Sequence, residues 1–180
     1  MRKIVIGGVG NVLLGDDGVG PYVVHLLEHH YHFEEGVSVC DLGTPGLDLV
    51  GHLSGIDALI LVDAISDDAP PGTLSLYRRE DILRHGPAPV RMDPHSPSLS
   101  ESLLIAEFTG EGPRDVLLIG ITGTQFEPGA PLTESVRHAA TLAVEEVLLE
   151  LERLDVDYHI RAGASLSPAW WEAQTDPVPA

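Results

Sequence analysis

The sequence predicts a single three-layer α/β domain, in which helices cover both faces of a mainly parallel, twisted sheet. Short apolar runs alternate with amphipathic stretches along most of the 180 residues. This alternation is typical of strands that are joined by crossover helices. We therefore expect an α/β domain over residues 1–159 and a tail over residues 160–180, where the pattern dissolves.

The predicted strands are short and apolar. Four runs predict strands, at residues 3–9, 37–41, 57–65 and 115–122, and the first of them is predicted to be buried. The run at 57–65, DALILVDAI, is apolar enough to be covered by helices on both faces. Residues 73–78, TLSLYR, alternate in polarity and follow Pro70 and Pro71. This pattern predicts an antiparallel strand at the edge of the sheet.

Four helices are predicted between and after these strands, at residues 21–31, 46–53, 98–108 and 133–153. Pro21 suits the first position of its helix, because a proline lacks the N–H group that is left unpaired there. Ser98 and Glu101 have the spacing of a capping box. In the last helix, apolar side chains recur at helical spacing, at Val136, Ala140, Ala143, Val147 and Leu151.

Composition excludes several classes of function. The net charge of −18 opposes binding to nucleic acid, since such binding depends on basic side chains that neutralise phosphates. The sequence has no apolar run of about 18 residues and no signal-peptide pattern, so we expect a soluble cytoplasmic protein without membrane insertion. The single cysteine, Cys40, excludes an internal disulfide and a cysteine-rich zinc site.

The stretch GGVGNVLLGDDGVG, which follows the first strand, resembles a phosphate-binding loop. Gly8 and Gly10 supply two glycines of the dinucleotide pattern, but Leu13 stands where the third is needed. Asp16 and Asp17 place negative charge before a helix, which repels phosphate and favours a cation. A dinucleotide enzyme is therefore disfavoured. Aspartates near a helix start are commonly caps, so this loop alone does not establish a metal site.

Polar side chains follow several strands at the edge where open α/β sheets bind their ligands. Besides the two aspartates above, these residues are Asp41, Gly43, Thr44, Asp63 and His95. Carboxylates with one imidazole make a plausible site for a divalent metal ion. On the residues alone the alternatives stay open, namely a turn cap for Asp63 and an ordinary loop position for His95.

Four stretches, taken in order, resemble the nickel-iron hydrogenase maturation endopeptidases: IVIGGVGNVLLGDDGVG, DLGTPGLDL, ALILVDAI and PHSPSL ahead of a helix. The first contains the specific signature G-x-G-N-x-L-x-x-D-[DE]-G-x-G, and the resemblance spans about residues 3–152. It implies that Asp17, Asp63 and His95 bind a metal and carry catalysis. It further implies substrate-binding roles for four residues, Asp16, Asp41, Gly43 and Thr44. The resemblance implies no role for Trp170 and Trp171.

The resemblance implies an endopeptidase that removes the C-terminal extension of a hydrogenase large-subunit precursor after nickel insertion. Nickel would then be recognised in the precursor, and another divalent ion would replace it in the isolated protein. We expect a monomer that acts on this nickel-loaded partner. Two alternatives stay open: a metal-dependent hydrolase of another substrate, and a non-catalytic nickel-binding maturation chaperone.

Overall fold

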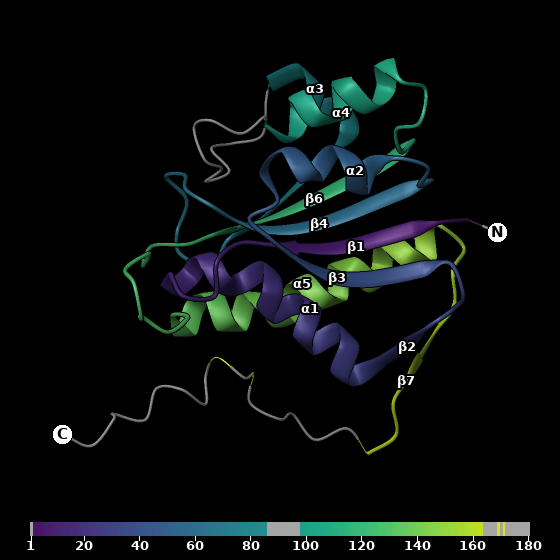
Figure 1. Cartoon of the computed structure of the whole chain (residues 1–180). Helices are drawn as coiled ribbons and strands as arrows, with labels where there is room; N and C mark the ends of the chain where they lie inside the picture. The colour runs from purple at the N-terminus through teal and green to yellow at the C-terminus, as the bar shows by residue number, and fades with distance from the viewer. Residues whose placement is uncertain (1, 86–97, 164–168, 170, 172–180) are drawn as a thin grey trace.

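A five-stranded sheet forms the centre of the protein, with the strand order β3-β1-β4-β6-β5 (Figure 1). The structure, a computed structural model, describes residues 2–85, 98–163, 169 and 171. Its parallel strands are β1 (Ile4–Val9), β3 (Val37–Gly43), β4 (Ala58–Ile65) and β6 (Asp115–Thr122). The fifth strand, β5 (Leu74–Arg78), pairs antiparallel with β6 at the edge. The predicted fold class and edge strand are confirmed.

Helices cover both faces of this sheet. Helices α1 (Val19–His30) and α5 (Glu134–Arg153) pack on one face, and α2 (Leu49–Leu53), α3 (Arg79–His85) and α4 (Leu99–Phe108) pack on the other (Figure 1). Each face has its own apolar core, and β4 contributes alternate residues to the two cores. No helix among the described residues is long and apolar enough to cross a membrane.

The sequence predicted where two helices begin, and the structure confirms one of these starts and shifts the other. The capping box of α4 is present, since Glu101 donates its N–H to the Ser98 hydroxyl and accepts the Ser98 N–H. Helix α1 differs from expectation, because it begins at Val19 rather than at Pro21. Pro21 is still in the first turn, where backbone N–H groups have no partner within the helix, so its ring costs no hydrogen bond.

Three short elements are present that sequence patterns did not predict. One is α3, and the others are β2 (Tyr31–Phe33) and β7 (Tyr158–Ile160), which pair antiparallel as a separate two-stranded ribbon. Beyond the ribbon, Ala169 is buried and Trp171 packs against the core on the α1 and α5 face. The domain boundary at residue 159 stays a prediction.

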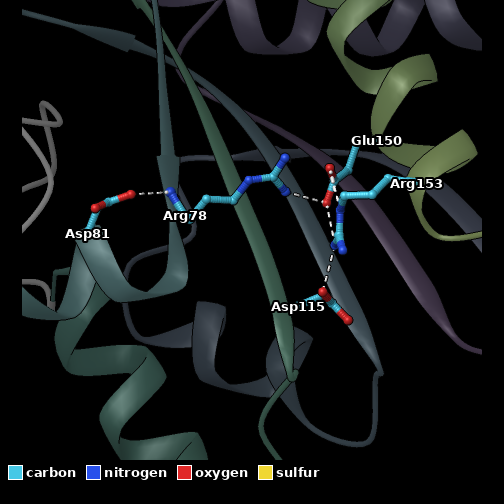
Figure 2. Close-up of polar contacts among 5 residues, drawn as sticks. All are labelled: Arg78, Asp81, Asp115, Glu150 and Arg153. Carbon is cyan, nitrogen blue, oxygen red and sulfur yellow. Dashed lines mark hydrogen bonds and ion pairs between the residues drawn. The ribbon is translucent and has the colours of Figure 1, made fainter.

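A network of charged side chains joins the edge strand to α5 (Figure 2). Glu150 is 3% exposed and accepts a hydrogen bond from Arg78 at 2.6 Å. Arg153 also pairs with Glu150, at 2.9 Å, and reaches Asp115 at 2.6 Å. The hydrogen bonds to these two carboxylates raise the pKa of Arg153. One buried negative charge is thus compensated by two guanidinium groups.

Replacing Glu150 by Gln should destabilise the protein, because two guanidinium groups then face each other without their shared anion. We expect the free energy of unfolding to fall by about 1–3 kcal/mol, less than for a fully buried pair because both arginines are partly exposed. Urea denaturation measures this change. Glu145→Gln, at an exposed position of the same helix, is the matched control and should change the free energy by less than about 0.5 kcal/mol. Equal effects would contradict the assigned role of Glu150.

Candidate active site

The loop after β1 is compact because backbone segments approach each other closely. Gly10 has a φ of 135°, and a Cβ at this position would collide with the backbone carbonyl of Asp17. Gly8 and Gly20 face each other across a similarly close contact, which brings the start of α1 against the ends of β1 and β4. This contact explains why glycine occupies position 8, because a Cβ there would collide with the backbone of Gly20.

Asp16 joins this loop to the connection between β6 and α5. It is completely buried, and its carboxylate accepts hydrogen bonds from the N–H groups of Thr124 at 2.9 Å, Gln125 at 3.0 Å and Thr133 at 2.7 Å. Its own N–H donates to the carbonyl of Gln125 at 2.7 Å. The structure therefore gives Asp16 a structural role, and its contact with substrate stays a prediction.

Asp17 and Asp63 form a buried pair of acids where β1 and β4 lie side by side. They are 7% and 5% exposed, and Asp63 is the first residue of β4 beyond its pairing with β1. The chain leaves β1 for β3 on one side and returns to β4 on the other, so this is the topological switch point of the sheet, where open α/β folds bind ligands. The N–H of Asn11 donates to Asp17 at 2.8 Å and fixes its carboxylate.

Electrostatics at this pair favour a proton or a cation. Burial, and then the nearby negative charge of Asp17, raise the pKa of Asp63 well above its ordinary value, and the hydrogen bond from the Ala64 N–H offsets this in part. Two carboxylates that repel each other in a desolvated site are stabilised when they share a positive charge. The pair can therefore exchange a proton with substrate or bind a metal ion.

The turn after β3 lies beside the same loop. The N–H of Gly43 donates to the side chain of Asp41 at 2.8 Å, and the carbonyl of Gly43 accepts the N–H of Gly10 at 2.8 Å. Asp41 and Thr44 are exposed, so both are accessible to a peptide. The structure thus places three of the predicted substrate-binding residues next to the loop that carries Asp17.

His95, the third predicted metal ligand, lies outside the described residues. Within residues 2–85, 98–163, 169 and 171, no three His, Cys, Asp or Glu side chains gather in a way that could hold a metal. Sequence reasoning did not identify Asn11, although this asparagine is part of the family signature. Its N–H fixes Asp17, and its side-chain oxygen accepts the N–H of Leu13 at 3.0 Å.

Replacing Asp16 by Asn should destabilise the fold far more than replacing Asp17 by Asn. An amide has one oxygen, so it leaves at least one of the three buried N–H groups without an acceptor, and we expect a loss of about 2–4 kcal/mol in the free energy of unfolding. Asp17→Asn should cost less than about 1 kcal/mol, because losing that charge also relieves repulsion on Asp63. Urea denaturation of the two variants compares these values. Similar losses would show that Asp16 does not hold the two loops together.

Asp63 should lower the stability of the metal-free protein as pH rises. Its pKa is higher in the folded chain than in the unfolded one, so between these two values the folded chain binds more protons and loses stability with increasing pH. Asp63→Asn removes this dependence, so its stability relative to wild type should rise with pH above about 4 and level off beyond the raised pKa. Thermal unfolding from pH 4 to 8 in a chelating buffer measures the difference, and a constant difference would contradict the prediction.

Comparison with known proteins identifies the family. Residues 21–150 match the family model for hydrogenase maturation protease. The chain is 35% identical to hydrogenase 2 maturation protease of Escherichia coli K12 over 158 residues, which cover 86% of this chain and 94% of that protein. It is 40% identical to the hydrogenase expression/formation protein HupM of Azotobacter chroococcum over 136 residues, or 75% of this chain and 65% of that protein.

Solved structures agree with this assignment. The hydrogenase maturating endopeptidase HybD from E. coli superposes with a TM-score of 0.81 at 34% identity, covering 90% of this chain and 99% of that one. A hydrogenase maturation protease HycI from Thermococcus kodakarensis gives a TM-score of 0.67 at 25% identity, covering 84% and 93%. The acid pair at the switch point thus occurs in a chain that belongs to the hydrogenase maturation protease family.

Proposed function

We propose that this chain is an endopeptidase that removes the C-terminal extension of a nickel-iron hydrogenase large-subunit precursor. The observation that carries this proposal is the buried Asp17 and Asp63 pair at the switch point of the sheet, in a chain of this family. Hydrolysis of a peptide bond needs a group that takes a proton from water and returns one to the leaving amine. A carboxyl group whose pKa is raised by burial and by a neighbouring negative charge, such as that of Asp63, suits this exchange.

A covalent mechanism through Cys40 has little support. Its Sγ is half-buried on β3 and donates to the carbonyl of Ile6 at 3.9 Å. Burial and the neighbouring charges of Asp41 and Glu28 raise the pKa of the thiol, so the nucleophilic thiolate is disfavoured. Direct attack of water, assisted by the acid pair, therefore fits the described residues better than a thioester intermediate.

The precursor supplies the metal in this proposal. Asp17, Asp63 and His95 bind nickel that is already held by the precursor, and its charge compensates the two repelling carboxylates. Three protein ligands leave coordination positions open for the precursor's own groups. Alternation along β4 puts Asp63 on the face that α3 and α4 cover, and the segment containing His95 joins these two helices. Asp41, Gly43 and Thr44 then hold the peptide beside the acid pair.

The proposal also holds that the protein acts as a monomer in the cytoplasm. The net charge of −18 makes copies of the chain repel each other, which supports a monomer. The precursor is the partner that brings positive charge to the site. Sedimentation equilibrium at physiological salt measures the oligomeric state directly.

Cleavage of purified precursor tests the function. Wild-type protein should release a C-terminal peptide from nickel-loaded precursor and leave nickel-free precursor intact, as seen by mass spectrometry. Asp17→Asn and Asp63→Asn should lower kcat/KM by at least about 100-fold, because each removes a carboxylate from the reacting site. Asp68→Asn, at an exposed position shortly after β4, is the control and should leave kcat/KM unchanged.

The other outcomes separate the alternatives. Equal cleavage of nickel-free precursor would contradict recognition through nickel. Stable binding of nickel-loaded precursor without release of a peptide would identify a maturation chaperone rather than a protease.

A further inference from the structure

A pocket of about 600 Å³ lies beside the turn that carries Asp17, between the loop after β1 and the connection that leads to α5. Its walls combine polar and apolar surface, and the apolar side chains include Val12, Leu13, Leu132 and Trp171. Gly15 and Gly18, which also line it, are the two ends of the 3₁₀ turn η1 (Gly15–Gly18) that carries Asp16 and Asp17. The pocket and Asp17, one member of the acid pair, therefore share one short segment of chain.

Leu13 is exposed on a backbone that is fixed on both sides. Its N–H donates to the side chain of Asn11 at 3.0 Å, and its carbonyl accepts the N–H of Gly129 at 2.8 Å. Its side chain is nevertheless 60% exposed at the pocket. Because the backbone of Leu13 is already fixed, little backbone conformational entropy is lost when a partner covers this side chain.

The opposite wall is also positioned by neighbouring groups. Arg137 donates to the hydroxyl of Tyr22 at 3.0 Å, and its guanidinium carbon lies 5.0 Å from the centre of the Tyr22 ring. The Trp171 ring packs edge-on against His25 at 6.0 Å. Among the described residues that line the pocket, Arg137 is the one whose side chain carries a charge. The pocket therefore favours an apolar group and disfavours a basic one.

We propose that this pocket is a substrate subsite, which binds an apolar side chain of the hydrogenase large-subunit precursor while Asp17 and Asp63 act on its peptide bond. The proposal rests on the proposed function, since it takes the precursor as the occupant. The shared η1 turn supports this choice, because it puts the pocket next to the chain segment that carries Asp17. The positive charge of Arg137 also distinguishes this subsite from the acid pair, which attracts cations.

Kinetics of three variants test the subsite. Leu13→Gln should raise KM for nickel-loaded precursor by roughly tenfold or more, because it removes apolar surface that substrate covers. Leu13→Met keeps the apolar contact and should stay within about threefold of wild type. Leu149→Gln is the matched control, since Leu149 is 55% exposed near the other end of α5, and its KM should not change. An unchanged KM in Leu13→Gln, while wild type cleaves the precursor, would overturn the subsite and leave the proposed function intact.

A binding measurement separates the subsite from catalysis. In a Trp170→Phe background, the emission of Trp171 should shift when a tryptophan-free synthetic peptide spanning the precursor's C-terminal extension is added, without nickel. Leu13→Gln, or serine in place of the apolar residues of the peptide, should abolish the shift, and Leu149→Gln should not. A shift that persists in Leu13→Gln would overturn the proposal. So would a Leu13→Gln variant that unfolds at lower temperature but binds peptide normally, because Leu13 would then serve internal packing.

Discussion

The carboxylate of Asp16 is the interaction on which the arrangement of the site depends. It collects three backbone N–H groups from the connection between β6 and α5, and it does so from within the turn that also carries Asp17. Backbone N–H groups in irregular loops have no strand or helix partner, so a buried acceptor is needed to satisfy them. One side chain thereby fixes two loops, the position of Asp17 and one boundary of the neighbouring pocket.

The two acids of the signature consequently have opposite physical roles. Asp16 is an anion surrounded by donors, which stabilises the fold, whereas Asp17 places a second negative charge near the desolvated carboxyl of Asp63. Catalytic sites often retain such unfavourable groups, because binding of substrate or metal then supplies the missing compensation. The glycines around the turn allow this combination, since they let the backbone of β1 and α1 approach closely enough to bury both acids.

Sequence patterns predicted the parts of the fold that depend on apolar periodicity. The central strands β1, β4 and β6 are largely apolar runs, and all five predicted core positions of α5, Val136, Ala140, Ala143, Val147 and Leu151, are buried. Helix α3 and the β2 and β7 ribbon were missed, because elements of three to seven residues are too short to show a period. The partners of Asp16 were not predictable, since they are backbone groups more than 100 residues away and have no side-chain signature. The sequence shows that Asn11 belongs to the signature. Its hydrogen bonds with Asp17 and Leu13 are seen only in the folded structure.

The order in which the chain is synthesised adds a constraint on this site. Asp16 and Thr133, which it binds, are separated by 117 residues, and Trp171 closes the pocket from still later in the chain. Domains fold as units during translation, and contacts between distant residues form late because the intervening chain must first be ordered. Asp16 and Asp17 are therefore synthesised early, before the connection between β6 and α5 exists. Until that connection is made, the loop after β1 lacks the hydrogen bonds that fix it. A ribosome-bound fragment that ends before β6 lacks the backbone groups that hold the turn of Asp16 and Asp17, so this turn can be fixed only after the connection between β6 and α5 has been synthesised.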